Sequence, residues 1–513
     1  MAKKKIMFIN APQTSNMGTI FTNLKFPLGF LYMANELEKH NFEVKILDCP
    51  VHYQKKRIVD KTSIKVGLLP EEIKKAIKEY QPDIVGVTCA YTAYEMDAFE
   101  TIDFIREAEK EMNKKILVVV GGAHTSANSK HVLRNEKIDI AVIGEGEETI
   151  VEIAENYHAG KSLNDISGTA SMHKGKFKIN KLRPYITDLE NLSPAWHLVD
   201  MSLYFNHPDN SQVTLRGPAV DIITSRGCPM ECVFCSIHTV WGRKWRGASA
   251  KKVVDDIELL VKKYGVRQIR IQDDNLTLNR KRTIEICDEI VRRKIDVKWD
   301  TPNGVAFWTL NEEMIKKMAR AGCYRITFGI ETASEKSQKY VGKTCDMKKI
   351  KELIDICHKH GMWVCSTFII GFPYETKKEI DETKMFVSNS KINFPFVYVA
   401  QPYQGTDMFH DFKNEGLLNE FQIASNVGRT KYGSKYYTHK ELNKMRTHLY
   451  ERFYIKRLLN YTNPLKLYRE FLSKVKSLED AKYVYKNTSS ILSRIKHPFY
   501  ADNFYKRLEF ASQ

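Results

Sequence analysis

Residues 225–235 read Ser225-Arg226-Gly227-Cys228-Pro229-Met230-Glu231-Cys232-Val233-Phe234-Cys235. The three cysteines have the spacing C-x3-C-x2-C, which lets three thiolates of one compact loop converge on a single centre. Ten cysteines in 513 residues do not make a disulfide framework, and the other seven are scattered singly, as small buried side chains are. We therefore expect this segment to bind a metal centre in a reducing compartment.

From Val220 onward, runs typical of strands alternate with runs typical of helices, and the cysteine segment lies after the first of these strands. Strands are expected at Asp221–Thr224, Gln268–Gln272, Lys298–Thr301, Arg325–Gly329, Trp363–Ile370 and Phe396–Gln401. Helices are expected between them at Lys251–Tyr264, Lys281–Lys294, Glu312–Arg320, Met347–His360 and Lys377–Val387. Six such units predict a partial (β/α)6 barrel, with its site at the C-terminal ends of the strands. The cysteines follow the first strand and so lie at that end.

Two metal centres suit the cysteines. Iron–sulfur clusters normally take four thiolates, so three would leave one iron open for a reactive ligand. Zinc is the alternative, because His238 follows Cys235 closely and three cysteines with one histidine form a recognised zinc set. The position favours the cluster, since structural zinc rarely occupies the loop after the first strand of a barrel.

The cysteine spacing, with an aromatic residue before the last cysteine, resembles the signature of radical S-adenosylmethionine (SAM) enzymes. Residues 271–275, 328–332, 368–373 and 401–406 resemble further segments of that superfamily, in the same order. There SAM chelates the fourth iron, and its reductive cleavage yields a 5′-deoxyadenosyl radical. The resemblance implies a [4Fe-4S] cluster held by Cys228, Cys232 and Cys235. It implies SAM contacts from Phe234, Asp273, Asp274, Glu331 and Gly371.

The first 155 residues also alternate strands and helices. Strands are expected at Ile6–Asn10, Glu43–Leu47, Ile84–Thr88, Ile116–Gly121 and Ile138–Ile143, and helices at Pro27–Lys39, Pro70–Tyr80, Ala98–Met112 and after Gly144-Glu145-Gly146. Continuous apolar strands predict a parallel sheet covered on both faces, a doubly wound, flavodoxin-like domain. Ligands of such sheets bind beyond the carboxyl ends of the strands.

Residues 27–31, 83–88, 120–124 and 144–147 resemble the cobalamin (B12)-binding domain of class B radical SAM enzymes. The D-x-H-x-x-G motif that supplies a cobalt-ligating histidine elsewhere is absent, and Asn10–Ser15 stands in its place. The resemblance covers about residues 5–410 and is nearest to methyltransferases typified by the fosfomycin-pathway phosphonate C-methylase. It implies cobalamin contacts from Pro12, Gly29, Thr88, Thr92, Gly121, Gly122, Glu145 and Gly146.

The implied chemistry needs no catalytic residue beyond the three cofactors. One SAM would methylate cob(I)alamin, and a second would give the radical that abstracts hydrogen from a small-molecule substrate. The substrate radical would then take the methyl group from methylcobalamin, so that an unactivated carbon is methylated. An electron donor such as flavodoxin or ferredoxin is implied. A cobalamin-dependent enzyme that cyclises, contracts rings or adds oxygen is one alternative, and a zinc-stapled basic nucleic-acid-binding protein is another.

Composition sets the remaining expectations. The net charge of +18 comes without a recognised nucleic-acid motif, so solvated basic faces, or attraction of an anionic substrate, explain it better than nucleic acid. No apolar run is long enough to span a membrane and no signal-peptide core is present, which predicts a cytoplasmic protein. We divide the chain into a cobalamin-binding-like domain (1–155), a linker (156–205) with a hairpin at Ser167–Ile179, a radical SAM core (206–410) and a helical C-terminal region (411–513).

Overall fold

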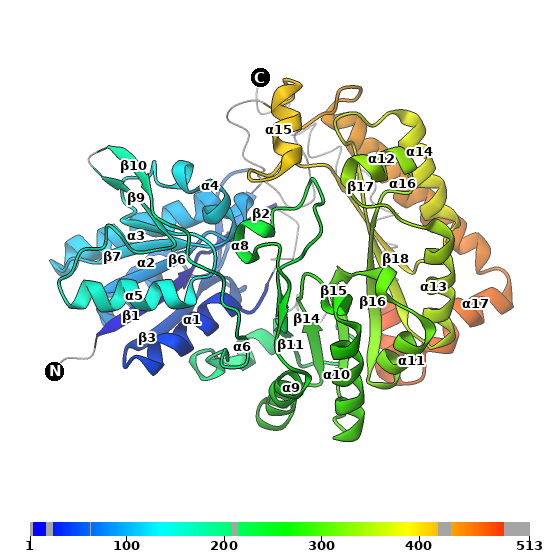
Figure 1. The fold of residues 1–513 in the computed structure, drawn as a ribbon, viewed down its shortest axis with the longest axis horizontal. Coiled ribbons are helices and arrows are strands. Elements are labelled where there is room, and N and C mark those ends of the chain that lie inside the picture. Colours follow the sequence, from blue (N-terminus) through cyan, green and yellow to red (C-terminus); the bar gives the residue numbers. More distant parts are fainter. Residues whose placement is uncertain are drawn as a thin grey trace.

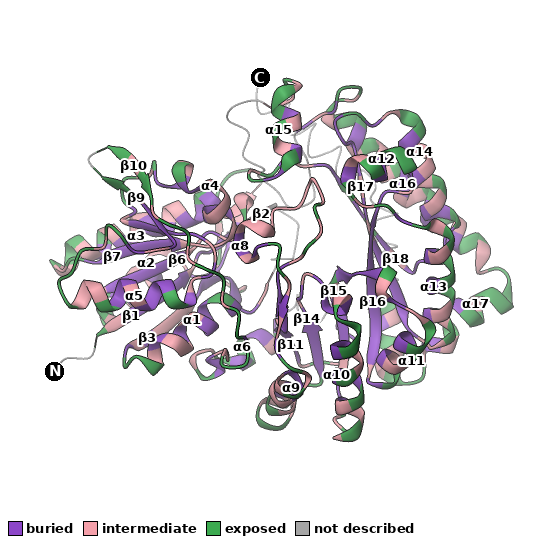
Figure 2. Ribbon diagram, in the orientation of Figure 1, coloured by how far each residue is buried: buried purple, intermediate pink, exposed green. Residues whose placement is uncertain are grey.

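The computed structural model describes residues 4–16, 24–61, 63–173, 175–207, 214–418 and 432–486. The chain forms two α/β lobes that lie side by side, the first in blue to cyan and the second in green to yellow (Figure 1). Each lobe is built on one large sheet whose central strands are buried (Figure 2). Parts of the expected C-terminal helical region, residues 419–431 and 487–513, lie outside the described residues.

The first lobe contains a seven-stranded sheet in the order β10-β9-β8-β7-β6-β1-β3. The strands are β1 (Lys5–Asn10), β3 (Glu43–Asp48), β6 (Ile84–Thr88), β7 (Leu117–Gly121), β8 (Ile140–Val142), β9 (Thr169–His173) and β10 (Lys176–Ile179). The helices are α1 (Leu28–Lys39), α2 (Pro70–Tyr80), α3 (Glu95–Met112), α4 (Ala123–Val132) and α5 (Glu147–His158). The five strands from β3 to β8 run parallel, which confirms the doubly wound fold.

Strand β1 shows why this sheet is covered on both faces. Its alternate residues Ile6 and Phe8 are buried with side chains of α1 and α5. Met7 and Ile9 point the other way and are buried with side chains of α2, α3 and α4. Successive side chains of a strand alternate between faces, so a continuous apolar strand needs helices on both sides.

Two features of this lobe differ from the sequence expectation. The hairpin β9–β10, which we expected within a linker, pairs antiparallel with β8 and so extends the first sheet. A second, three-stranded sheet in the order β2-β5-β4 was not expected; its strands are β2 (Gln13–Asn16), β4 (Lys56–Ile58) and β5 (Ser63–Val66). These strands are short and mostly polar, so they lack the hydrophobic alternation that identifies a strand.

The second lobe contains a six-stranded parallel sheet in the order β11-β14-β15-β16-β17-β18. The strands are β11 (Ala219–Ile222), β14 (Gln268–Ile271), β15 (Lys298–Val305), β16 (Cys323–Glu331), β17 (Trp363–Ile370) and β18 (Phe394–Val399). The helices α9 (Ala250–Tyr264), α10 (Arg280–Arg292), α11 (Glu312–Arg320), α13 (Met347–Lys359) and α14 (Lys377–Asn389) lie along its outer face (Figure 1). Strands β11 and β18 are the two edges, so the partial (β/α)6 barrel is confirmed.

Shorter elements connect these units. They are α6 (Met201–Phe205), β12 (Ser225–Arg226), α8 (His238–Trp241), β13 (Arg246–Gly247), α12 (Glu335–Val341), α15 (Asp407–Asn414) and the 3-10 turns η1 (Cys49–Val51), η2 (Thr92–Tyr94), η3 (Trp196–Leu198), η4 (Leu276–Leu278) and η5 (Phe307–Thr309). Of these, β12, β13 and α8 surround the cysteine segment.

The described C-terminal residues are helical, as expected, and pack on the barrel. They form α16 (His439–Asn460), α17 (Pro464–Glu470) and η6 (Leu472–Lys474). The guanidinium of Arg457 is buried and binds the Glu470 carboxylate at 2.7 Å and the Ser390 carbonyl at 3.0 Å. These helices therefore pack against the side of the barrel at β18. Among the described residues, no helix is both long and apolar enough to cross a membrane.

Candidate functional site

The cysteine loop runs between β12 and α8, next to the carboxyl end of β11. Its backbone is held at three points: the Cys228 amide donates to Gly242 at 3.4 Å, the Cys235 amide to Cys232 at 3.0 Å, and the Val233 amide to Val341 at 3.2 Å. All three thiols are free and half-buried. The structure thus brings the three predicted cluster residues together in one loop at the mouth of the barrel.

Gly227, directly before the first cysteine, could not be another residue without rearrangement. Its φ is +83°, and a Cβ atom there would lie 2.4 Å from the carbonyl oxygen of Lys244. Only glycine adopts this conformation readily and leaves room for so close an approach. The sharp turn directs the chain from β12 into the cysteine loop.

Asp273, predicted as a SAM contact, has its carboxylate engaged by the chain itself. It accepts hydrogen bonds from the Thr224 amide at 2.6 Å, the Thr224 hydroxyl at 2.6 Å and the Ser225 hydroxyl at 2.5 Å. The side chain is buried. Asp273 therefore holds the entry to the cysteine loop against the end of β14.

Replacement of Asp273 with alanine is expected to lower the free energy of unfolding by about 3 kcal/mol or more, because it leaves several buried donors without an acceptor. Urea unfolding measured by circular dichroism tests this. Asp288, whose exposed side chain pairs with Lys317, is the matched control; its alanine variant should change stability by about 1 kcal/mol or less. Equal losses in the two variants would contradict the anchoring role.

Asp274, the second predicted acidic residue, is half-buried and accepts a hydrogen bond from the Gly227 amide. Burial, together with the neighbouring charge of Asp273, raises the pKa of Asp274 to about 7. Its electrostatic influence reaches Cys235. A carboxyl group with this pKa beside the loop can bind a cation such as an ammonium group, which would return it to its ionised form.

Glu331 ends β16 in an unusual conformation. Its φ is +66°, in the left-handed region that non-glycine residues rarely adopt. The carboxylate lies 3.3 Å from the Lys343 ammonium and accepts from the Thr367 hydroxyl at 3.1 Å. Both Glu331 and Lys343 act electrostatically on Cys232. Backbone strain of this kind gathers at functional sites, which supports the prediction that Glu331 faces SAM.

The other two predicted SAM contacts have structural explanations. Phe234 packs against a buried apolar cluster that contains Phe372 and Met408. Gly371 has a φ of +85°, and a Cβ atom there would lie 2.8 Å from a methyl carbon of Leu442 in α16. Close packing of the C-terminal helix is therefore sufficient to require glycine at this position.

The thiols suit a cluster better than a single metal ion. Burial raises the pKa of Cys232 and raises that of Cys235 to about 11, so a bound metal centre, whether cluster or single ion, must displace their protons. Among the residues that the structure describes, no three His, Cys, Asp or Glu side chains are placed to hold one metal ion. Zinc would draw sulfurs to within about 3.8 Å of each other at its usual bond length. A four-iron cube holds each thiolate on a different iron, and so farther apart.

A cavity of about 390 Å³ lies at the carboxyl edge of the first sheet and opens toward the second lobe. One wall is formed by the first lobe, with Gly29 at the start of α1 and Gly121 at the end of β7. The opposite wall is formed by residues that flank the cysteine loop, among them Ile237 and Trp241. The cavity also runs between the sheet and α1, past Phe8. It therefore lies between the two lobes and close to the cysteine loop.

Six of the eight predicted cobalamin residues line this cavity: Gly29, Thr88, Gly121, Gly122, Glu145 and Gly146. Pro12 instead lines a separate small cavity with Gly67 and Leu68. Thr92 is not among the lining residues, and its hydroxyl forms a hydrogen bond with Nδ1 of His124 at 2.9 Å. Pro12 and Thr92 each stand one position from a residue that lines the cavity, Gln13 and Tyr91, and the turns beyond the strand ends direct such neighbours differently.

The lining fits cobalamin. A Cβ atom at Gly29 would meet nothing within 4 Å, so the space above it is open. The buried Oε1 of Gln13 has no hydrogen-bond partner and belongs to the lining, where it can accept from a ligand amide, a group that cobalamin carries at its periphery. None of the described lining residues is a histidine, and both nitrogens of His124 are engaged, Nε2 by Glu95 at 3.0 Å. The residues present therefore suit cobalamin without a histidine ligand to cobalt.

Some residues that line the cavity were not predicted individually. Gln13, Lys25 and Trp241 line it outside the predicted set, and Tyr91 lies within the segment Thr88–Tyr94, which the resemblance implies faces the corrin. Gln13 and Tyr91 lie three positions beyond the carboxyl ends of β1 and β6, and this position was the available signal. Trp241 could be placed only by the packing of α8 against the first lobe.

An ion network joins the lobes at this cavity. It comprises Glu145 and Glu147 at the start of α5, Arg226 in β12 and Arg246 in β13. Arg226 binds the Glu145 carboxylate at 2.7 Å and the Glu147 carboxylate at 2.6 Å. Arg246 binds the other oxygen of Glu145 at 2.9 Å. The Glu145 side chain, predicted to contact cobalamin, thus serves first as an interdomain contact.

Comparison with known proteins agrees with this geometry. Residues 222–387 match the radical SAM superfamily and residues 21–154 match the B12 binding domain. An uncharacterized methyltransferase, PH0819, of Pyrococcus horikoshii is 30% identical over 469 residues, which cover 89% of this chain and 94% of that protein. The cytidylyl-2-hydroxyethylphosphonate methyltransferase of Streptomyces wedmorensis is 27% identical over 81% of this chain and 83% of its own length.

The alternatives fare differently. The anaerobic magnesium-protoporphyrin IX monomethyl ester cyclase of Rubrivivax gelatinosus is 28% identical over 69% of this chain and 63% of its own length. A cyclase outcome is thus represented among the relatives, whereas the zinc-stapled nucleic-acid-binding alternative gains no support from them.

Solved structures show the same fold. The structure of the cobalamin-dependent S-adenosylmethionine radical enzyme OxsB with aqua-cobalamin bound matches with a TM-score of 0.69 at 17% identity, covering 92% of this chain and 72% of that chain. Matches to family models establish both cofactor domains. A relative is 30% identical to this chain over 89% of its length. This chain therefore belongs to the cobalamin-dependent, class B radical SAM enzymes, which use a [4Fe-4S] cluster, SAM and cobalamin.

Proposed function

We propose that this enzyme transfers a methyl group to an unactivated carbon of a small molecule. The observation that carries the proposal is the interdomain cavity, whose walls come from the carboxyl edge of the cobalamin-binding sheet and from the flanks of the cysteine loop. This arrangement supports the proposal that both cofactor sites open on one chamber, so that a substrate radical could form within reach of a methyl donor.

The residues of the chain bind, orient and exclude water. Cys228, Cys232 and Cys235 would hold the cluster, with Asp274 and Glu331 beside it to receive the polar groups of SAM. When bound, the cluster and SAM supply a 5′-deoxyadenosyl radical, and cobalamin supplies the methyl group. The walls of the chamber are mostly apolar, so cofactors and substrate bound there would displace water and protect a reactive substrate.

Product stoichiometry tests the proposal. The full-length protein, reconstituted anaerobically with iron, sulfide and cobalamin, is incubated with methyl-labelled SAM, a strong reductant and small-molecule extracts. Methylation predicts S-adenosylhomocysteine and 5′-deoxyadenosine in about equal amounts, together with label in a new compound. Formation of 5′-deoxyadenosine without S-adenosylhomocysteine would reject methylation and support a cyclase-like outcome, as in the magnesium-protoporphyrin relatives.

Asp274 predicts a pH dependence of SAM binding. With its pKa at about 7, the carboxylate becomes fully charged only above neutral pH, so SAM affinity should rise from pH 6 to pH 8. Below its pKa, the charged fraction changes by up to about tenfold for each pH unit. Anaerobic calorimetry on the enzyme and on the Asp274→Asn variant measures this rise as a difference, because the amino group of SAM itself titrates in both. Identical pH profiles would contradict an ionic contact.

The same carboxyl group makes a prediction about stability. Its pKa in the folded protein lies above the ordinary aspartate value, so the folded state binds more protons than the unfolded state between about pH 4 and pH 7. The contribution of Asp274 to stability is therefore greatest below this window and is lost as the pH rises through it.

We also propose an anionic substrate, a one-electron donor and a reducing compartment for this enzyme. The net charge of +18 and the half-exposed Lys25, 4.0 Å from Asp221, support an anionic substrate. A one-electron donor such as flavodoxin or ferredoxin would reduce the cluster. Ten free cysteines support a reducing compartment such as the cytoplasm.

A further inference from the structure

The loop Gly144-Glu145-Gly146-Glu147 both lines the interdomain cavity and forms ion pairs with the second lobe. Gly144 and Gly146 are small lining residues of the interdomain cavity. The carboxylates of Glu145 and Glu147 instead bind arginines of the second lobe. The segment that would support cobalamin is therefore the same segment that contacts the entry to the cysteine loop.

The ion network is built to be rigid. All four side chains are at most 5% exposed. The Glu145 carboxylate also accepts from the Ile186 amide at 2.8 Å, so both of its oxygens have several donors. Buried charges of opposite sign must keep their partners, because loss of one leaves an uncompensated charge away from water. Separation of the two loops would therefore leave buried charges without their partners.

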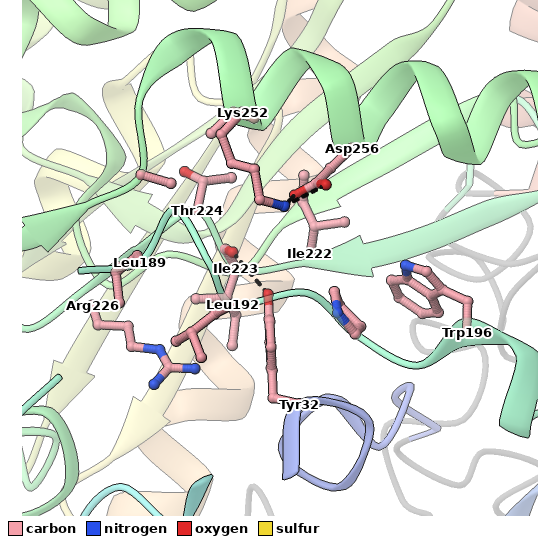
Figure 3. A pocket seen from close by; sticks show the side chains of 13 residues that line it. Tyr32, Leu189, Leu192, Trp196, Ile222, Ile223, Thr224, Arg226, Lys252 and Asp256 are labelled. Carbon is pink, nitrogen blue, oxygen red and sulfur yellow. Dashed lines mark hydrogen bonds and ion pairs between the residues drawn. The ribbon is translucent and has the colours of Figure 1, made fainter. Parts of the chain in front are cut away.

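Aromatic rings enclose the arginine of this network. The guanidinium of Arg226 lies 4.5 Å from the ring centre of Trp241 and 5.2 Å from that of Tyr32. The Tyr32 hydroxyl crosses the interface and donates to the Ile223 carbonyl at 3.2 Å, and Figure 3 shows this contact with Arg226 nearby. Trp241 itself lines the cavity, and its carbonyl accepts from Arg246 at 2.7 Å.

The connection to the cluster is short. Arg226 stands two positions before Cys228, separated from it only by Gly227. The glycine turn is tightly packed, since a Cβ atom there would also lie 3.2 Å from the carbonyl oxygen of Trp241. A shift of the cavity wall at Gly144–Glu147 would therefore be passed through Arg226 to the first cluster cysteine, with no compressible segment between them.

We propose that the network of Glu145, Glu147, Arg226 and Arg246 couples the two cofactor sites, so that cluster assembly and cobalamin binding strengthen each other. The inference rests on the proposed placement of the cluster and cobalamin. Its role is positioning: each cofactor, by ordering its own loop, orders the loop of the other. Thermodynamic linkage requires the effect to be reciprocal.

The test measures cofactor binding and not methyl transfer. The dissociation constant of hydroxocobalamin is determined by anaerobic spectrophotometric titration for the full-length protein with and without a reconstituted cluster, in the absence of SAM. We expect about tenfold tighter binding when the cluster is present, in the range typical of coupled sites. Conversely, cobalamin should slow the loss of iron to a chelator.

In the variant Glu145→Gln/Glu147→Gln, the cobalamin dissociation constant measured without the cluster, divided by the one measured with it, should be near one, whatever the affinity of the variant for cobalamin alone. Glu148→Gln is the matched control: it lies in the same helical turn, its side chain is 58% exposed, and it should keep the wild-type ratio. The coupling would be overturned if this ratio of dissociation constants were one in the wild-type protein, or if it were undiminished in the double variant; either result would leave the proposed function intact. If the wild-type protein bound no cobalamin at all, both the coupling and the proposed function would be overturned.

A milder variant covers the case in which the double variant does not fold. Glu147→Gln leaves the bonds of Glu145 to both arginines in place and removes only the charge facing one nitrogen of Arg226. Its ratio should fall between the wild-type value and one. An unchanged ratio in this folded variant would count against the proposal on its own.

Discussion

Replacement of Cys232 with alanine is expected to abolish the iron–sulfur chromophore and to lower 5′-deoxyadenosine formation about a thousandfold or more. The loss corresponds to about 4 kcal/mol or more of transition-state stabilisation. Cys232 occupies the middle of the C-x3-C-x2-C spacing, beside Glu331 and Lys343. With two thiolates left in the loop, a four-iron cluster would have two irons without protein ligands and could not be kept intact.

The measurement is the visible absorbance after anaerobic reconstitution, followed by quantification of 5′-deoxyadenosine. Cys287→Ala provides the control, because Cys287 is a buried thiol in α10 away from the loop. That variant should lose only about 1 kcal/mol of stability and keep both the chromophore and the activity. Retention of the chromophore in Cys232→Ala would remove the assignment of the cluster to this loop.

Replacement of Gly122 with alanine is expected to weaken cobalamin binding about a hundredfold and to cost about 2–4 kcal/mol of stability. Gly122 has a φ of +115°, and a Cβ atom would lie 2.9 Å from the backbone carbon and oxygen of Cys89. The obstruction is backbone, so no side-chain rotation relieves it. The end of β7 must then move relative to the end of β6, and both ends line the cavity.

Spectrophotometric titration with hydroxocobalamin and urea unfolding measure the two effects. Gly160→Ala separates strain from collision, because Gly160 has a φ of +66° but nothing within 4 Å of its would-be Cβ. It should lose about 1 kcal/mol, from strain alone, and bind cobalamin as the parent does. Wild-type cobalamin affinity in Gly122→Ala would show that the cofactor does not use this edge of the sheet.

Local sequence patterns were sufficient to predict the main elements. The helices Pro70–Tyr80 and Glu312–Arg320 and the strand Trp363–Ile370 have the expected bounds, because their hydrophobic periodicity matches the face that they bury. Helix α4 was missed because Ala123–Val132 has no apolar stripe. The β2-β5-β4 sheet was missed because its strands are short and mostly polar, and because β2 pairs with a strand distant in the chain.

The candidate site likewise has parts that local sequence patterns predicted and parts that depend on the tertiary structure. The sequence by itself determined the three-cysteine loop, its place after the first barrel strand and the glycine-rich ends of the first sheet, because each is a short contiguous pattern. The tertiary structure alone decided what the acidic residues do: Asp273 bonds to Thr224 across 49 positions, and Glu145 to Arg226 across 81. A carboxylate has the same chemistry in either role. Whether it meets a ligand or another part of the chain depends on packing, which no local pattern encodes.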